Sequence, residues 1–155
     1  RNVKYNGGNN AVPWLCRWIE RHKEQVLLVC PEVMGGLPTP RLPAEIQSKG
    51  PDPGTSPNNR RVVNKAGEDV TAQFLLGAEK VLEIANRYHI AAAVLKSNSP
   101  SCSGSYIYDG TFSGTRIAGQ GITAALLIEH GVKVYSEKTV TPELLEELMG
   151  NRCKI

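Results

Sequence analysis

Residues 90–106 read IAAAVLKSNSPSCSGSY, an apolar run followed by a loop of small polar residues with one cysteine. The run Ile90–Leu95 has the continuous apolar character of a β-strand that is buried on both faces of a parallel sheet. In open parallel sheets, ligands bind where the strands end at their carboxyl edge, and the serine-rich loop occupies that place. The loop is therefore either a solvated connection or the floor of a functional site.

Helix and strand patterns alternate on both sides of this stretch. Apolar residues at helical spacing and helix-end signals predict four helices, over Val12–His22, Ala72–His89, Ile122–Glu129 and Pro142–Met149. Short apolar runs predict four strands, over Gln25–Cys30, Arg61–Asn64, Ile90–Leu95 and Val132–Tyr135. This alternation predicts an α/β fold, a three-layer sandwich with a mostly parallel sheet of the Rossmann-like or flavodoxin-like kind. Residues 1–155 are expected to form a single domain.

Composition and charge narrow the class of protein. With 155 residues, 41% of them hydrophobic and 21% charged, the chain has the composition of one globular domain. Its net charge of +3 gives little electrostatic steering, so no strong nucleic-acid signal is present. No apolar stretch approaches the roughly 18–20 residues that span a bilayer, and the first ten residues lack the apolar core of a signal peptide. We therefore expect a cytoplasmic protein with no membrane partner.

The segment 32–59 differs from the rest of the chain because it contains six of the ten prolines. Such a density predicts a long Pro/Gly-rich loop with little regular structure, and long loops in compact domains are usually functional or disordered. Its second part, Pro51–Asn59, is expected to be the most mobile. Its first part contains Arg41, which could bind an oxygen or anion, or could instead have only a helix-capping or surface role.

The four cysteines are scattered along the chain without a C-x-x-C pair. This spacing argues against a zinc ribbon or a thioredoxin-type motif, and it favours free or metal-bound thiols. Cys30 closes a predicted strand, and Cys102 follows Leu95 by seven residues. Both should lie at the same sheet edge, where two thiols can share a ligand. Cys16, on a predicted buried helix face, and Cys153 are expected to be structural thiols.

Other catalytic templates fit the sequence poorly. A cysteine phosphatase needs an arginine six positions after the nucleophile, but Tyr108 stands there after Cys102. A dinucleotide loop is suggested only weakly by residues 119–121, because the third glycine is missing. The three histidines lie near predicted helix C-termini, where they interact with the helix dipole: His22, His89 and His130. Thiolates from separate loops remain, and such thiolates commonly hold iron–sulfur clusters.

Five segments of the chain resemble, in order and spacing, the thiouracil desulfidase family. They are VCPEVMGGLPTPR (29–41), GEDVT (67–71), SPSC (99–102), IYDGTFSG (107–114) and GQGITAALL (119–127). The resemblance implies a [4Fe–4S] cluster that is held by three cysteines and leaves one iron open as a Lewis acid. It implies removal of sulfur, without net redox change, from a small thiolated pyrimidine such as 2-thiouracil, giving uracil and sulfide.

The family motifs place two cluster ligands in this sequence. The cysteine of the C-P-E motif is Cys30, and that of the S-P-S-C motif is Cys102. In the family, another cysteine lies in a short strand and loop just before a segment that resembles NVKYNGG, residues 2–8 here. The third ligand and first strand are therefore expected upstream of residue 1. The family typically has glycine directly after the second motif, whereas this chain has Ser103.

Further roles are hypotheses from the chemistry of the reaction. Replacing C=S by C=O requires water to attack the carbon, and a carboxylate beside the cluster is the natural base. Glu32, two residues from Cys30, is favoured over Asp109, which precedes a glycine and could be only a turn residue. Arg41 could hold a substrate oxygen. The serines expected to contact the carbonyl and ring-nitrogen edges of the pyrimidine are Ser97, Ser99 and Ser101.

Two alternative functions use the same sheet edge. The chain could be a small-molecule or nucleotide-binding module without a cluster, or a sulfur-transfer accessory of the kind that serves tRNA thiolation. Brown colour after anaerobic reconstitution with iron and sulfide would separate the two cluster-dependent functions from the binding module.

Overall fold

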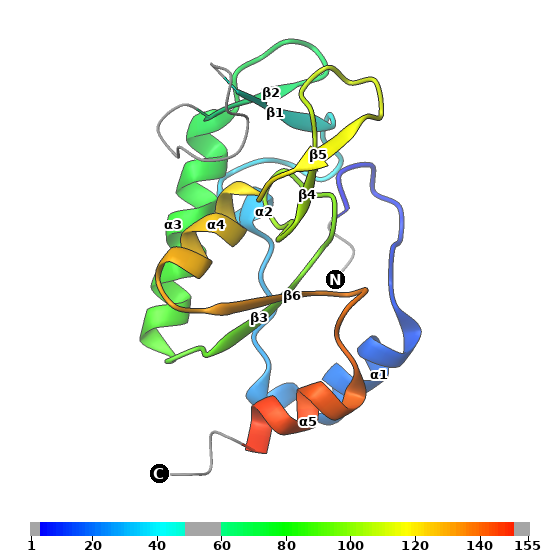
Figure 1. Cartoon of the computed structure of the whole chain (residues 1–155), viewed down its shortest axis with the longest axis vertical. Helices are drawn as coiled ribbons and strands as arrows, with labels where there is room; N and C mark the ends of the chain where they lie inside the picture. Colours follow the sequence, from blue (N-terminus) through cyan, green and yellow to red (C-terminus); the bar gives the residue numbers. More distant parts are fainter. Residues whose placement is uncertain (1–3, 49–59, 151–155) are drawn as a thin grey trace.

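The computed structural model describes residues 4–48 and 60–150. The helices are α1 (Pro13–Arg21), α2 (Pro31–Met34), α3 (Thr71–Arg87), α4 (Ile122–Glu129) and α5 (Pro142–Gly150), with one 3-10 turn, η1 (Lys23–Gln25). The strands are β1 (Ala44–Ser48), β2 (Arg60–Asn64), β3 (Ala92–Leu95), β4 (Tyr106–Tyr108), β5 (Arg116–Ala118) and β6 (Lys133–Ser136). Figure 1 shows β1 and β2 at one end of the molecule, α1 and α5 at the other, and β3 and β6 between them.

The described strands form three two-stranded sheets. β3 and β6 are parallel, in a register that runs from Ala92 opposite Lys133 to Leu95 opposite Ser136. β1 pairs with β2, and β4 pairs with β5, both antiparallel. The predicted α/β class is therefore confirmed as a mixed α/β domain with one parallel pair. A three-layer sandwich with a mostly parallel sheet is not confirmed by these residues.

The long helix α3 contributes to both parts of the hydrophobic core. Phe74 and Ala78 on its first half pack with apolar residues of β1, β2 and β4. Val81 and Ala85 on its second half pack with Leu95 and with residues of and next to α4. These four positions are the apolar stripe at i, i+4, i+7 and i+11 that fits one face of a helix. In Figure 1, α3 runs along one side of the strands accordingly.

α2 lies directly against α3 because Gly35, which follows α2, and Gly77 of α3 let the two backbones approach. A Cβ added at Gly77 would come within 1.9 Å of the carbonyl oxygen of Pro31, and one added at Gly35 would come within 1.9 Å of that of Gln73. Neither distance is compatible with a side chain, so the contact requires glycine on both sides. This backbone-to-backbone contact fixes the position of the residues around Pro31.

The proline-rich segment contains more regular structure than the sequence predicted. α2 and β1 both lie within or at the edge of residues 32–59, so the expectation of an irregular loop is wrong for these parts. α2 begins at Pro31, where the missing amide of proline costs nothing. β1 is stabilised by pairing with β2. The predicted mobile part, Pro51–Asn59, lies outside the described residues.

Two other predictions are corrected by the structure. Residues 26–30 do not form a strand, although Val26 and Cys30 have extended backbones. No backbone hydrogen bond joins residues 26–29 to another described residue, and this lack of a partner is the reason. Cys16 is exposed rather than buried, because it points away from the apolar side of α1. Cys153 lies outside the described residues.

An apolar groove separates the extended segment 26–30 from β3. It has a volume of about 240 Å³ and is lined by residues 25–29 and 90–95 together with apolar side chains of α1, α3 and α5. Leu27 and Leu28 remain 47% and 64% exposed. Among the described strands, only β6 pairs with β3. None of the described helices combines the length and apolar character needed to cross a membrane.

Candidate active site

The first cysteine of the site lies where the extended segment 26–30 meets α2. Cys30 has an extended backbone and directly precedes the helix, and the Met34 amide donates to its carbonyl oxygen at 2.9 Å. Glu32 falls in the first turn of α2. Because the contact between Gly35 and Gly77 seats α2 against α3, it also sets where Cys30 and Glu32 lie.

The second cysteine lies in the serine-rich loop that follows β3. The hydroxyl oxygen of Ser99 accepts hydrogen bonds from the amides of Ser101 and Cys102, both at 3.1 Å. The amide of Ser103 donates to the carbonyl oxygen of Ser99, also at 3.1 Å. Asn98 takes the left-handed conformation, with a φ of 62°, that asparagine tolerates better than most residues. The loop is thus a compact turn organised around Ser99.

The far side of this loop is attached to the start of α4. The amides of Ile122 and Thr123 donate to the carbonyl oxygens of Pro100 and Ser101, each at 2.9 Å. The hydroxyl groups of Ser101 and Thr123 lie 3.0 Å apart, and both residues are fully buried. A Cβ added at Gly121 would lie 2.4 Å from the carbonyl carbon of Ser101, so the loop and helix touch through backbone atoms. Ser101 therefore serves to attach the loop to α4.

The carboxylate of Glu32 connects the two cysteine-bearing segments. Nε of Arg41 donates to Oε2 of Glu32 at 2.6 Å, and the side chains of Arg41 and Glu32 are only 8% and 14% exposed. The hydroxyl of Ser99 donates to the other oxygen, Oε1, over a longer distance of 3.4 Å. Arg41 is itself oriented by bonds from Nη1 to the carbonyl oxygen of Pro38 and to the hydroxyl of Thr39, both at 3.2 Å. Glu32 is thus an oriented, ion-paired carboxylate.

The pKa of the Cys102 thiol responds to the charges of both Glu32 and Cys30. Burial, followed by the negative charges of Glu32 and Cys30, raises the pKa of the Cys102 thiol to about 12. Hydrogen bonds from the Ser99 side chain and the Lys96 backbone oppose this rise in pKa. A thiol in such surroundings needs a strong positive partner to become a thiolate, and a bound metal is the usual one.

A polar cavity opens on the Arg41 side of Glu32. Its volume is about 500 Å³, which falls in the range of small-molecule sites. The lining residues come from α2, the segment after it, β2 and the start of α3; the polar ones are Glu32, Arg41, Asn64, Glu68, Asp69 and Gln73. Glu32 and Arg41 therefore line a cavity large enough for a small heterocycle, whereas Cys30, Cys102 and Ser99 are not among its lining residues.

The structure brings five of the predicted site residues together and gives three others separate contacts. Cys30, Cys102, Glu32, Arg41 and Ser99 form the cluster described above. Ser97 binds the carboxylate of Glu137, through its hydroxyl at 2.6 Å and its amide at 2.8 Å. Ser101 is buried against Thr123.

Asp109 is the remaining predicted residue, and it lies in the loop between β4 and β5. Its carboxylate accepts hydrogen bonds from the hydroxyl and amide of Thr111 at 2.6 and 3.0 Å. These bonds hold the pKa of Asp109 below its usual value, which makes it a weaker base. The buried carboxylate of Glu45 accepts from the amides of Gly110 and Phe112 and so attaches this loop to β1. Asp109 thus has the contacts of a turn residue.

Sequence reasoning did not find several residues that shape the site. The close contacts at Gly77 and Gly121 have no signal in a single sequence, because any glycine in or before a helix looks the same. Thr123 lies inside an apolar helix and looked like part of its buried face. Glu137 had a usable signal, since it directly follows β6 and so lies at the same sheet edge as the serine-rich loop.

The donor set of the site fits part of an iron–sulfur cluster. Cys30 and Cys102 provide two adjacent soft thiol ligands, which such clusters prefer. Within residues 4–48 and 60–150, no group of three or more Cys, His, Asp or Glu side chains converges to hold a metal ion. The described residues therefore fit two of the three thiolates that the sequence resemblance implies.

Comparisons with known proteins identify the family that the chain resembles. The family described as 2-thiouracil desulfurase matches residues 1–139. The uncharacterized protein YbbK of Bacillus subtilis (strain 168) is 42% identical over 134 residues, covering 86% of this chain and 87% of the relative. A solved structure of the [4Fe-4S]-dependent thiouracil desulfidase TudS superimposes with a TM-score of 0.78 at 41% identity, covering 96% of this chain and 90% of that one.

Proposed function

The chain belongs to the 2-thiouracil desulfurase family, and from this premise we propose that it hydrolyses the thiocarbonyl of a small thiolated pyrimidine such as 2-thiouracil. Water supplies the oxygen of the new carbonyl, sulfur leaves as sulfide, and uracil is the other product, so no electrons are transferred. The observation that carries the proposal is the oriented Glu32 carboxylate between Arg41 and Ser99, directly beside Cys30 and Cys102.

We propose Cys30 and Cys102 as two ligands of a [4Fe–4S] cluster, with the third thiolate supplied from upstream of residue 1. When bound, such a cluster with one open iron supplies a Lewis acid that accepts the substrate sulfur and polarises the C=S bond. The chain's own contribution is to hold two thiols and a carboxylate within one small, largely buried region. A cytoplasmic location belongs to this proposal because its reducing conditions keep thiols free.

Glu32 is the residue we assign to the attacking water. Its carboxylate is fixed on one oxygen by Arg41 at 2.6 Å, so it cannot rotate freely. The other oxygen, which Ser99 approaches at 3.4 Å, keeps the capacity to accept a proton from water. A positioned carboxylate of this kind orients the water and removes its proton as the new C–O bond forms. Asp109 is the weaker candidate, because Thr111 occupies its carboxylate.

Substrate contacts are proposed for Arg41 and Ser99. Both side chains bind the Glu32 carboxylate, and Glu32 and Arg41 line the cavity of about 500 Å³ in which we place the pyrimidine. Arg41 is suited to a carbonyl oxygen and Ser99 to a ring edge. Ser97 and Ser101, which the sequence also suggested, use their hydroxyls within the protein. We retain Ser99 as the serine that contacts substrate because its hydroxyl, unlike those of Ser97 and Ser101, lies beside the Glu32 carboxylate.

The test distinguishes the loss of the cluster from the loss of the general base. The protein, including any residues that precede Arg1, is reconstituted anaerobically, and iron content and sulfide release from 2-thiouracil are measured together. Glu32→Gln should keep its iron but lose roughly 10²–10⁴-fold in rate, the usual weight of general-base catalysis. Cys30→Ala and Cys102→Ala should lose iron and activity together, because each removes a ligand.

Cys16→Ala and Glu129→Gln are the matched controls, since Cys16 is an exposed thiol and Glu129 an exposed carboxylate outside the site. Both should behave like the wild type. A fully active Glu32→Gln would remove Glu32 from the chemistry. Iron-free protein that still releases sulfide would refute the cluster, and iron-free protein that only binds the pyrimidine would favour the binding-module function.

A further inference from the structure

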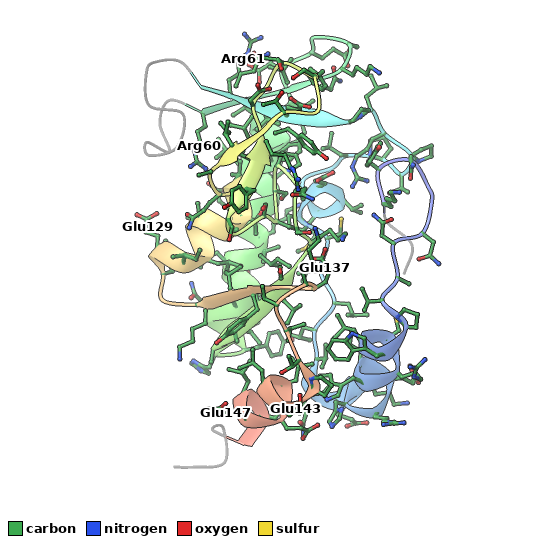
Figure 2. The ribbon with its side chains drawn as sticks, turned by 45° about the vertical axis from the view of Figure 1, so that its right-hand side comes forward. Arg60, Arg61, Glu129, Glu137, Glu143 and Glu147 are labelled. Carbon is green, nitrogen blue, oxygen red and sulfur yellow. The ribbon has the colours of Figure 1, made fainter. Side chains whose placement is uncertain are left out.

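Glu137 joins the ends of the two parallel strands. It directly follows β6, and the pairing of Leu95 with Ser136 places it opposite the first residues after β3. Its carboxylate accepts three hydrogen bonds from that segment: from Nζ of Lys96, from the Ser97 hydroxyl at 2.6 Å and from the Ser97 amide at 2.8 Å. Only 10% of the Glu137 side chain is exposed. Figure 2 shows Glu137 at the end of β6, well away from Glu129 on α4.

The charge of Glu137 makes these bonds strong. Burial by itself raises the pKa of Glu137, but the bonds from Lys96 and Ser97 outweigh it and hold the pKa below its usual value. Glu137 is therefore ionised at neutral pH, and hydrogen bonds to an ionised acceptor are roughly twice as strong as neutral ones. No function considered above uses this carboxylate.

The segment that Glu137 holds leads directly into the site. The backbone of Lys96 acts on the Cys102 thiol and lowers its pKa, against the larger effect of burial, which raises it. Two residues after Ser97, the Ser99 side chain binds the amides of Ser101 and Cys102 and approaches Glu32. The later half of the loop is fixed by α4, so Glu137 provides the attachment of its first half.

We propose that Glu137 is a positioning residue, which holds the Lys96–Ser97 peptide so that Ser99 and Cys102 are presented to the site. It touches neither the thiols nor Glu32, and it acts through the loop. The effect of Glu137 on the reaction rate rests on the proposed desulfidation. The effect of Glu137 on the loop does not rest on it, so loop order and reaction rate are measured separately.

The first measurement is residue-resolved amide hydrogen exchange by NMR on the metal-free protein. In Glu137→Gln, loss of the charged acceptor should speed exchange of the Ser97 amide. The informative amides are those of Ser101 and Cys102, which bind Ser99 and not Glu137. If Glu137 positions the loop, both should exchange about 10-fold faster, Glu137→Asp should restore part of the protection, and Glu129→Gln should change nothing.

Two results would overturn the proposal. Acceleration confined to Ser97 would show a local hydrogen bond without influence on the site. Equal acceleration in the middle of α3, for instance at Val81, would show general destabilisation instead of loop positioning.

The second measurement is sulfide release from 2-thiouracil by the reconstituted enzyme. Glu137→Gln should lower kcat by about 10-fold or more, because small displacements of reacting groups are costly, while KM changes less since Arg41 is untouched. Glu137→Asp should recover part of the rate. Unchanged kcat in Glu137→Gln would overturn the catalytic part of the inference. An inactive wild type would instead refute the proposed function, and hydrogen exchange would still decide whether Glu137 holds the loop.

Discussion

The two cysteine-bearing segments of the molecule are held in place in opposite ways. The loop around Cys102 is fixed by its own hydrogen bonds, with Ser99 at its centre and α4 on its far side. The segment before Cys30 has an extended backbone, and residues 26–29 make no backbone hydrogen bond with any other described residue. Cys30 is positioned from the other direction, by the seating of α2 on α3.

This difference shows that one site can depend both on local hydrogen bonds and on a contact between residues far apart in the sequence. The position of Cys102 is encoded within a few residues of it, by serines that bond to nearby amides. The position of Cys30 is encoded by Gly77, more than forty residues away, through a contact between two helices. A change near Cys102 should thus act locally, whereas a change on α3 should move the other cysteine.

The largest effects are expected at the close glycine contacts. Gly77→Ala would place a methyl group 1.9 Å from the Pro31 carbonyl oxygen, and Gly121→Ala would place one 2.4 Å from the Ser101 carbonyl carbon. Relief requires backbone movement, so each variant should lose about 3 kcal/mol of unfolding free energy by urea denaturation. Gly77→Ala recovers up to about 1 kcal/mol of this through the better helix propensity of alanine.

Gly150→Ala is the control, because nothing lies within 4 Å of its added methyl group. It should be neutral or slightly stabilising. The comparison between the two segments would fail if Gly77→Ala left Cys30 where it is, judged by unchanged chemical shifts of Cys30 and Glu32.

The buried hydroxyl pair between Ser101 and Thr123 should give the next largest effect. Thr123→Val keeps the shape of the side chain but leaves the Ser101 hydroxyl buried without its partner, at a cost of about 1–3 kcal/mol. Ser101→Ala in addition should recover part of that loss, because no unsatisfied group then remains. A double-mutant cycle measured by urea denaturation gives the coupling energy. Strictly additive effects would show that the pair does not attach the loop to α4.

A smaller effect on the unfolding free energy distinguishes the loop around Cys102 from the extended segment before Cys30. Ser99→Ala removes the acceptor of two amides and should cost about 1 kcal/mol. Leu28→Ala, on the extended segment, removes a side chain that is 64% exposed and should change the unfolding free energy by less than about 0.5 kcal/mol. Both are measured in the same denaturation series. A larger loss for Leu28→Ala than for Ser99→Ala would reverse the comparison.

The smallest effect is a pH dependence that arises from Glu137. Because its folded pKa lies below its usual value, Glu137 stabilises the fold fully above its unfolded pKa of roughly 4.3. This contribution is lost as the pH falls through the folded pKa, where the carboxylate becomes protonated. Unfolding free energy measured between pH 7 and 3 should therefore decline less steeply in Glu137→Gln than in the wild type. Parallel curves would show that Glu137 makes no such contribution.

Elements with a strong local pattern were predictable from the sequence. The apolar stripe of α3, the helices α1, α4 and α5, and the parallel strands β3 and β6 all appear close to their expected positions. α2 was not predictable, because four residues that begin with proline carry no helical period. β1 was missed because it depends on pairing with β2 across residues 49–59. Residues 26–30 were called a strand on composition, which cannot reveal whether a partner strand is present.

The candidate site was predictable to a similar extent. Cys30 and Cys102 were expected together because strands end at one edge, a premise that fails for residues 26–30, and Glu32 followed from its place beside Cys30. The contact of Arg41 with Glu32 could be suggested but not assigned, because it depends on how the proline-rich segment folds back. The serines could not be told apart by sequence, since only geometry shows that Ser99 faces Glu32 while Ser97 and Ser101 face Glu137 and Thr123.

The extended segment 26–30 beside the apolar groove also affects how the protein associates in solution. Within residues 4–48 and 60–150 the amides and carbonyls of residues 26–29 have no backbone partner, and the side chains of Leu27 and Leu28 are exposed, so the segment forms an edge of the kind that recruits strands from other molecules. No proline or lysine interrupts residues 26–29, so the usual protection against such recruitment is missing there. A polypeptide of residues 1–155 alone should therefore self-associate through that edge in concentrated solution, and Leu28→Lys should delay the onset of turbidity.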